Sequence, residues 1–258
     1  MASDLSLENV SVAAGRKVLL DAVSMRVAKG QFLALVGPNG AGKTTVLRAA
    51  LGLTDATGSV ILDGSPVRQW KGLERAARAA WLPQHPAVIE PVTALELVCA
   101  ARLRFHEPRH ASESAALAAL ERAGVAAFAG RAVTTLSGGE RQRVAVAALL
   151  AQDAPLLLLD EPANHLDPGQ QIALYRLLGE LWREGRGVLC VTHDVNLLGW
   201  LGEPARVRVA GLRDGRVAFE SRYDAPELPA LLSSLFEIEM RALHVDDRRL
   251  LVPAGGAP

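Results

Sequence analysis

Nine consecutive residues early in the chain combine three glycines with a lysine and two threonines. They read Gly37-Pro38-Asn39-Gly40-Ala41-Gly42-Lys43-Thr44-Thr45, and this order fits the pattern G-x-x-x-x-G-K-[ST]. The glycines let backbone N–H groups turn inward around phosphate oxygens, and a helix that starts there adds partial positive charge. Lys43 is then placed for the β and γ phosphates, and the Thr44 hydroxyl for Mg²⁺. We therefore predict a nucleoside triphosphate site, with a structural glycine-rich turn as the alternative.

Two adjacent carboxylates, Asp160 and Glu161, follow the apolar run Leu156–Leu159. The run predicts a buried strand, so both acids would lie at its carboxyl end, where α/β proteins bind ligands. There Asp160 can hold Mg²⁺, directly or through water, and Glu161 can polarise an attacking water as general base. A strand that simply ends in solvated acids is the better interpretation of this segment alone. The phosphate loop favours the catalytic interpretation.

A histidine and a glutamine follow two other apolar segments. His193 comes directly after Val188–Thr192, a predicted strand, and lies where a contact to the γ-phosphate is expected. Gln84 follows Trp81-Leu82-Pro83 in a predicted loop. A lone histidine is usually structural and a loop glutamine is usually a surface residue. Both assignments therefore depend on the neighbouring motifs.

The segment Leu136-Ser137-Gly138-Gly139-Glu140-Arg141-Gln142 predicts a helix start of an unusual kind. Ser137 and Glu140 have the spacing of a capping box. Two glycines in the first turn cost roughly 1 kcal/mol each relative to alanine. That cost makes sense if another backbone or a phosphate must approach closely. The alternative is an ordinary helix start that tolerates poor helix formers.

The segments around these groups predict the elements that position them. Buried strands are expected at Phe32–Val36, Leu156–Leu159 and Val188–Val191. The alternation of strands and helices along the chain favours a parallel α/β core. Further strands are expected at Leu5–Val12 and Val60–Leu62, and Asp214-Gly215 is typical of a hairpin turn. From Pro86 to Gln152 alanine dominates, and this stretch predicts a helical lobe.

Two helices in this plan carry recognisable start signals. Thr93 and Glu96 have capping-box spacing. Asp167 caps a second helix, with Pro168 in its first turn, and Gly185 ends it.

Composition limits the classes of protein that remain. The chain has 258 residues, formal net charge +0 and 50% apolar residues, so it can bury a substantial core, and a neutral balance argues against nucleic acid as a partner. Two cysteines, Cys99 and Cys190, favour a reducing compartment. We expect neither a signal peptide nor a membrane span, because the first residues and the apolar runs lack the required pattern.

Taken together, the motifs resemble the ABC ATPase family, from about residue 4 to 220. Leu136–Gln142 is similar to the family signature, residues 37–45 to its phosphate loop and Gln84 to its Q-loop. Leu156–Glu161 is similar to the Walker B strand with the catalytic glutamate, Leu166-Asp167 to the loop that follows, and His193 to the switch histidine.

The resemblance implies a fold, cofactors and a partner. The fold is a P-loop NTPase (RecA-like) core with a parallel sheet, an N-terminal antiparallel β-subdomain and an inserted α-helical subdomain. One domain would span 1–258, with the core and β-subdomain at 1–85 and 153–220, the helical subdomain at 86–152 and an extension at 221–258. ATP and Mg²⁺ are the implied cofactors. Each ATP would lie in a head-to-tail dimer, between one phosphate loop and the partner copy's residues 137–139. Gln142 and Asp167 would belong to the nucleotide site, and Gln84 to both the metal and the catalytic groups.

Two departures from the family pattern stand out. Members usually carry an aromatic residue near the first strand that stacks on adenine, whereas the matching stretch here is Val12–Arg16. We expect weaker or less base-selective nucleotide binding unless Arg16 or Val18 covers the ring, because base stacking is worth about 1–3 kcal/mol. Asn164-His165 also precedes Leu166-Asp167, and His165 is either a residue near the dimer seam or a surface histidine.

Other residues of the chain resemble the ATPases of importers for haem, cobalamin and ferric siderophores. These are Trp70, Arg75–Arg78, Ala80–His85 and Thr192–Leu197. The expected assembly places this chain on the cytoplasmic face of the inner membrane, against an integral membrane permease that works with a substrate-binding protein. Pro86–Val98 would take the permease's coupling helix, although ordinary packing explains part of that segment.

An exporter and a soluble non-transport ABC protein remain as alternatives. A P-loop kinase or GTPase and a non-hydrolysing cassette are disfavoured by the signature and by Glu161 with His193.

Overall fold

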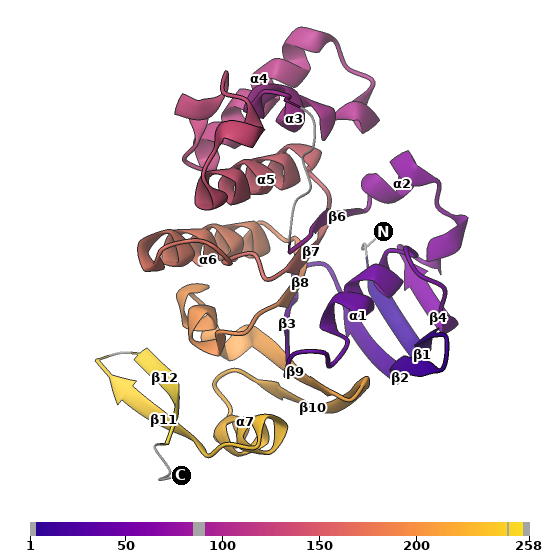
Figure 1. Ribbon diagram of the computed structural model, residues 1–258, viewed down its shortest axis with the longest axis vertical. Helices are drawn as coiled ribbons and strands as arrows, with labels where there is room; N and C mark the ends of the chain where they lie inside the picture. The colour runs from indigo at the N-terminus through magenta and orange to yellow at the C-terminus, as the bar shows by residue number, and fades with distance from the viewer. Residues whose placement is uncertain (1–3, 85–90, 247, 255–258) are drawn as a thin grey trace.

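The computed structural model describes residues 4–84, 91–246 and 248–254. A six-stranded sheet crosses the centre of the molecule in the order β10-β9-β3-β8-β7-β6 (Figure 1). Five strands pair in parallel and β10 pairs antiparallel to β9. The strands of this sheet are β3 (Phe32–Val36), β6 (Ala79–Leu82), β7 (Leu156–Asp160), β8 (Gly187–Val191), β9 (Val207–Arg213) and β10 (Arg216–Arg222).

The apolar runs at β3, β7 and β8 form buried central strands, as predicted, because both faces of the sheet are covered. Phe32 and Ala34 pack with α6 (Pro168–Arg183) on one face, in a core that also contains Tyr175. Leu33 and Leu35 pack with α1 (Lys43–Ala50) and the N-terminal strands on the other face. Burial on both faces explains why these strands are continuously apolar rather than alternating.

A second sheet, antiparallel and four-stranded, lies beside α1 in the order β2-β1-β4-β5. Its strands are β1 (Leu5–Ala14), β2 (Lys17–Val27), β4 (Thr57–Leu62) and β5 (Ser65–Pro66). Leu5, Leu7 and Val10 face the shared core, which gives β1 the alternation expected of a half-buried strand. A short helix, α2 (Gly72–Ala76), precedes β6.

The helical lobe expected at 86–152 lies at the top of Figure 1 and has its own apolar core. It contains α3 (Ala94–Ala100), α4 (Arg109–Arg122) and α5 (Gly138–Gln152). Thr93 caps α3 and forms a reciprocal capping box with Glu96, as predicted. The part of the expected permease groove at 86–90 lies outside the described residues.

The chain continues past the sheet into a helix and a hairpin. Asp214 and Gly215 both have positive φ, at 47° and 74°, and connect β9 to β10 as a tight turn, as predicted. Beyond them α7 (Leu228–Phe236) precedes the two-stranded β11 (Met240–Val245) and β12 (Arg248–Pro253), coloured yellow in Figure 1. No sequence pattern predicted this hairpin.

Short 3₁₀ helices complete the connections. They are η1 (Val67–Gln69), η2 (Leu103–Phe105), η3 (Ala126–Phe128), η4 (Val133–Thr135), η5 (Val195–Trp200) and η6 (Pro204–Arg206). In the described residues no helix is both long and apolar enough to cross a membrane. The fold-class prediction is therefore confirmed: a parallel α/β core, an antiparallel N-terminal sheet and an inserted helical lobe.

Candidate functional site

The phosphate loop joins the carboxyl end of β3 to α1. Gly42 is the N-cap of α1, with φ 104° and ψ 10°, a backbone conformation that residues other than glycine rarely adopt. A Cβ at Gly42 would lie 2.7 Å from the Leu19 carbonyl oxygen, so this glycine also allows β2 to approach the loop closely. The loop thus surrounds the N-terminus of α1, where backbone N–H groups point outward and attract anions.

Lys43 lies inside this loop. Its Nζ donates to the Gly37 carbonyl at 2.8 Å and to the Pro38 carbonyl at 3.0 Å. Burial lowers the Lys43 pKa, and the nearby Glu161 and Asp160 carboxylates oppose that shift. The ammonium is therefore held over the loop and close to the acidic strand end, which is the position that a triphosphate-binding lysine requires.

Asp160 ends β7 and is 1% exposed. Both of its carboxylate oxygens are buried and make no hydrogen bond of ordinary geometry with the described residues. Burial raises its pKa, whereas the Thr44 hydroxyl and the Lys43 ammonium act in the opposite direction. Leaving a buried carboxylate without a partner is costly, so this group is one that a cation would stabilise.

Magnesium fits these groups. The described residues contain no cluster of three or more His, Cys, Asp or Glu that would form a metal site by itself. Mg²⁺ is usually bound by one or two protein oxygens together with water and substrate phosphates rather than by an all-protein cage. The orphaned Asp160 oxygens next to the Thr44 hydroxyl match that donor set.

The Glu161 side chain contacts three other residues of the site. Its backbone has φ 51°, outside the strand conformation, and its side chain is 10% exposed. One carboxylate oxygen, Oε2, accepts hydrogen bonds from Gln84 Nε2 at 2.7 Å and Asn164 Nδ2 at 2.6 Å. The other, Oε1, contacts His193 Nε2, whose side chain is 43% exposed. The structure therefore brings the predicted Gln84, Glu161 and His193 together from three different strand ends.

Asn164 is a site residue that sequence reasoning did not identify. Its amide donates to Glu161 from three residues further along the chain. The signal was present, since an amide placed three residues after a carboxylate in a turn can return to it. It was treated only as a variant of the family loop.

The signature segment forms the predicted helix start. Ser137 caps α5, its backbone N–H donates to Glu140 Oε2 at 2.7 Å, and the Glu140 N–H donates to Ser137 Oγ at 3.3 Å. A Cβ at Gly139 would lie 3.2 Å from the His165 carbonyl oxygen and from Gln170 Oε1. The missing side chain therefore also permits α5 to pack on the loop that follows β7. No hydrogen bond among the described residues links 137–139 to this chain's own phosphate loop.

Gln142 and Asp167 have structural contacts of their own. Gln142 is 2% exposed, and its Nε2 donates to the Pro162 carbonyl at 2.9 Å. Its side chain thus joins α5 to the loop after β7 rather than facing solvent. Asp167 caps α6 as predicted, with Oδ1 accepting from the Gln170 N–H at 2.9 Å.

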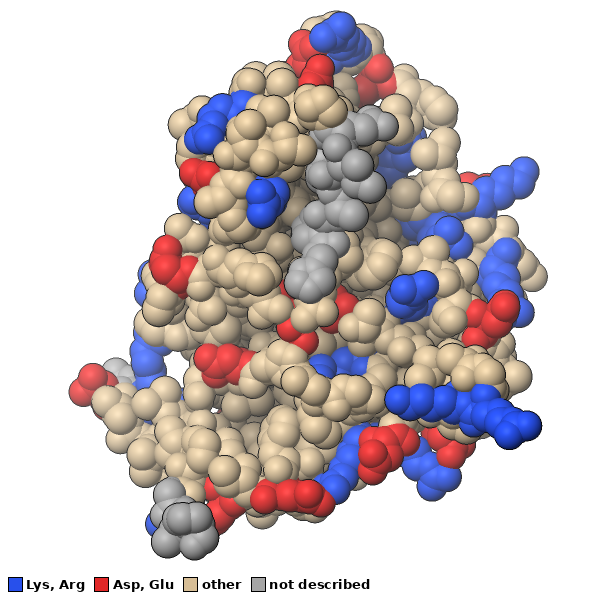
Figure 2. Space-filling model, in the orientation of Figure 1, with Lys and Arg blue, Asp and Glu red and all other residues tan. Residues whose placement is uncertain are grey.

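The residues expected near adenine lie on the β1–β2 hairpin. Arg16 is exposed, and Val18 is 60% exposed. The neighbouring Leu19 carbonyl is the atom that approaches Gly42, so this hairpin runs directly past the phosphate loop. Figure 2 shows acidic and basic side chains interspersed over the visible face, without one continuous basic patch.

Comparison with known proteins agrees with this geometry. The family model described as ABC transporter matches residues 20–164. The chain is similar to the hemin import ATP-binding protein HmuV of Nocardia farcinica, at 43% identity over 240 residues, which covers 91% of this chain and 82% of that protein. The corresponding protein of Myxococcus xanthus is 37% identical over 266 residues, and the match covers 98% of each.

A solved structure extends the comparison to the fold. A dimeric ATP-binding cassette in a post-hydrolysis state, bound to ADP and Pi, matches with a TM-score of 0.78 at 29% identity and covers 86% of this chain and 99% of that one. The family model spans more than half of the sequence and the curated relatives cover most of it. The chain therefore belongs to the ABC transporter family, as one of its ATP-hydrolysing cassettes.

Proposed function

We propose that this chain powers the import of haem across the inner membrane, by binding ATP with Mg²⁺ and hydrolysing it to ADP and phosphate. The observation that supports the chemistry is the Glu161 carboxylate, held by Gln84, Asn164 and His193 beside the phosphate loop. The observation that supports the cargo is that relatives with up to 43% identity over 91% of this chain are hemin import proteins.

The chemistry follows from the positions of these groups. Residues 37–45 bind the triphosphate through backbone N–H groups, and Lys43 offsets charge on the β and γ phosphates. Thr44 and Asp160 would hold Mg²⁺, with Gln84 as a further candidate, and the ion would supply positive charge opposite the phosphate oxygens. Glu161 accepts a proton from the attacking water. His193 contacts Glu161 and lies at the edge of the site, where it can donate to the γ-phosphate.

A second copy completes the site. The N-terminus of α5 at Ser137, Gly138 and Gly139 carries no bulky side chain and suits a phosphate. Among the described residues it makes no hydrogen bond to the phosphate loop of the same chain. A related cassette is dimeric with ADP and Pi bound. We infer a head-to-tail dimer in which these residues, with Asp167 on the adjoining loop, meet the partner's nucleotide.

The permease would dock on the helical lobe. A groove of about 660 Å³ lies there, in which Leu95, Cys99 and Leu103 stand among charged side chains such as Arg109 and Glu113, and Leu103 is 71% exposed. Exposed apolar surface bordered by polar side chains is typical of a protein-binding site. The permease would hold this chain at the cytoplasmic face, and a substrate-binding protein would act through the permease. Importer names among the relatives favour this function over an exporter or a soluble ABC protein.

Growth on haem tests the proposal in the native host. Deletion of this chain should abolish growth when haem is the sole iron source, and growth on a ferrous salt should continue. The wild-type chain should restore haem-dependent growth, and Glu161→Gln, produced at the same level, should not. Undiminished growth of the deletion strain on haem would contradict the proposed cargo.

A further inference from the structure

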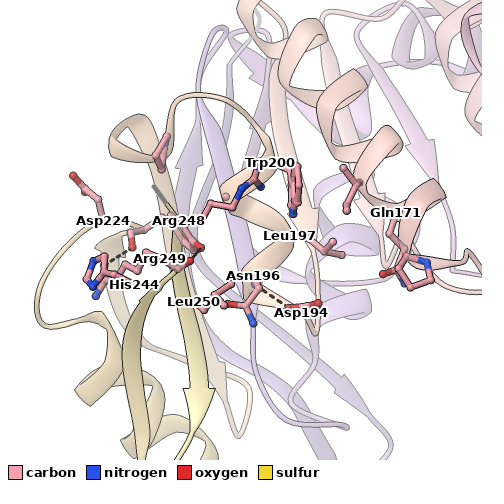
Figure 3. A pocket seen from close by; sticks show the side chains of 15 residues that line it. Gln171, Asp194, Asn196, Leu197, Trp200, Asp224, His244, Arg248, Arg249 and Leu250 are labelled. Carbon is pink, nitrogen blue, oxygen red and sulfur yellow. Dashed lines mark hydrogen bonds between the residues drawn. The ribbon is translucent and has the colours of Figure 1, made fainter. Parts of the chain in front are cut away.

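A cavity lies between the C-terminal hairpin and the segment that follows β8 (Figure 3). Its volume is about 460 Å³, within the range of sites for drug-sized molecules. One wall is the β11–β12 hairpin, the second is η5, and the third is the first turn of α6. We call it the hairpin cavity.

The walls of the hairpin cavity are mainly apolar. Ile172 of α6, Leu197 and Trp200 of η5, and Leu250 of β12 line it. Trp200 stands within this lining in Figure 3, and Leu197 lies beside it. These side chains favour a ligand with an apolar body.

Arg248 is the basic group of the cavity lining that lies against Trp200. Its guanidinium lies 3.2 Å from the centroid of the Trp200 ring, whereas Arg176, 4.9 Å from the same centroid, is outside the cavity lining. Neither arginine makes an ion pair with a carboxylate of the described residues. Within the described part of the chain, Arg249 likewise donates only to the Tyr223 and Ala225 carbonyls. Guanidinium groups without carboxylate partners beside an apolar wall are suited to an anion.

Among the described residues, neither acidic residue of the cavity lining, Asp194 or Asp224, makes an ion pair with Arg248. Asp224 pairs with Arg222 at 3.0 Å. Asp194 Oδ1 accepts from the Asn196 N–H at 2.8 Å. The anion-binding capacity of Arg248 is therefore not cancelled by a carboxylate held against it.

The Asn196 side chain connects the hairpin to the segment that follows the catalytic-site residue His193. The Asn196 side chain donates to the Leu251 carbonyl at 3.1 Å and accepts from the Leu251 N–H at 2.7 Å. This pair of bonds joins the hairpin to Asn196 of η5, three residues after His193. Pro168, which follows Asp167, lines the opposite wall. A ligand here would touch both segments that lead into the nucleotide site.

We propose that the hairpin cavity is an effector site for an amphipathic anion, an apolar molecule with one carboxylate, sulfonate or phosphate group. The apolar body lies against Ile172, Leu197 and Leu250, and the anionic group pairs with Arg248, whose guanidinium lies over the Trp200 ring. Occupancy stiffens the Asn196–Leu251 connection and changes the rate of ATP hydrolysis through His193.

Dye binding tests the site. The probe is 8-anilinonaphthalene-1-sulfonate, a flat apolar sulfonate, titrated into the full chain with saturating ADP so that the nucleotide site is filled. Fluorescence should report one saturable site, and Arg248→Gln should weaken it roughly tenfold, since a charge-assisted contact is lost. The matched control is Arg241→Gln, on the same hairpin but paired with Glu239 and outside the cavity lining. It should bind the dye as wild type does.

A rate measurement tests the coupling. At saturating ATP the dye should change the ATPase rate of the wild type and of Arg241→Gln, and Arg248→Gln should lose that response. Equal dye affinity in the two variants, or no saturable binding, would refute the site. Dye that binds without changing the rate would refute the coupling. The dye titration does not need ATP hydrolysis, so it remains valid if the chain proves inactive as an ATPase.

Discussion

The Asn164 amide donates a 2.6 Å hydrogen bond to Glu161 Oε2, the same oxygen that accepts from Gln84 at 2.7 Å. Two neutral amides thus hold one carboxylate oxygen, while His193 contacts the other. A general base must be aimed at the water that it deprotonates, so fixing its orientation affects the rate. Asn164 acts on the reaction through Glu161 and is a positioning residue.

Asn164→Ala should therefore lower kcat roughly tenfold, since one hydrogen bond to a charged group is lost while two remain. The KM for ATP should stay within about twofold, because the hydrogen bonds of Asn164 among the described residues go to Glu161 and not to the phosphate loop. Gln171→Ala is the matched control, since it removes a bond to the Ala163 carbonyl in the same loop without touching Glu161. A similar fall in kcat for both variants would mean that Asn164 only supports the loop.

The local elements of this site could be predicted from the sequence. The fully buried strands β3, β7 and β8 are short apolar runs, and the capping residues Thr93, Ser137 and Asp167 stand where helices start. These signals depend on neighbours within a few residues, where patterning and capping chemistry decide the outcome.

Long-range contacts could not be predicted in the same way. Gln84 reaches Glu161 across 77 residues, and only the order of strands in the sheet brings them together. The inward turn of Gln142 and the docking of the C-terminal hairpin through Asn196 and Leu251 depend on tertiary packing. For the hairpin no family motif was available to replace that information.

Alanine substitutions at two glycines of the phosphate loop should separate the cost of a steric contact from the cost of the backbone conformation. Gly42 has φ 104° and a backbone oxygen 2.7 Å from the position of a Cβ. Gly40 has φ 79° but nothing within 4 Å of that position. Gly40→Ala should cost about 1–2 kcal/mol of unfolding free energy from conformation alone. Gly42→Ala should cost more, roughly 2–4 kcal/mol, and should also weaken ATP binding.

Urea denaturation and nucleotide titration measure these two effects. Each variant is compared with the wild type by its free energy of unfolding and by its Kd for ATP. Equal destabilisation by the two substitutions would show that the contact with Leu19 does not limit the size of residue 42.

Asp160 should make the free protein less stable as pH rises. Burial raises its pKa above the ordinary value of 3.8, so the folded chain binds this proton more tightly than the unfolded chain. The stabilising contribution of the protonated form is complete below about pH 4 and is lost as pH rises through the folded-state pKa. Asp160→Asn should therefore raise the Tm at neutral pH without magnesium, and the gain should shrink toward pH 4.

Thermal melts from pH 4 to 8 with a chelator present test this expectation. Asp55→Asn, at an exposed aspartate, is the control and should show no such pH-dependent gain. Magnesium with ADP should stabilise the wild type more than Asp160→Asn, because the variant lacks the carboxylate that holds the ion. A variant that is no more stable at pH 8 than at pH 4, relative to wild type, would contradict the burial argument.

The head-to-tail dimer can be tested by combining two substitutions. Glu161→Gln should slow hydrolysis about 10²–10⁴-fold, the usual range for loss of a general base, and should accumulate an ATP-bound dimer detectable by light scattering. Ser137→Arg on that background adds a bulky cation at the N-cap of α5, a residue that makes no hydrogen bond to this chain's own phosphate loop among the described residues. ATP should still bind the single subunit with similar affinity, and the dimer should be lost.

A mixture of Ser137→Arg and Lys43→Ala chains should regain one intact composite site per pair, formed by the Lys43 of one chain and the Ser137 of the other. If the Ser137→Arg variant dimerised at the same ATP concentrations as the parent chain, the signature segment would not bind the partner's nucleotide.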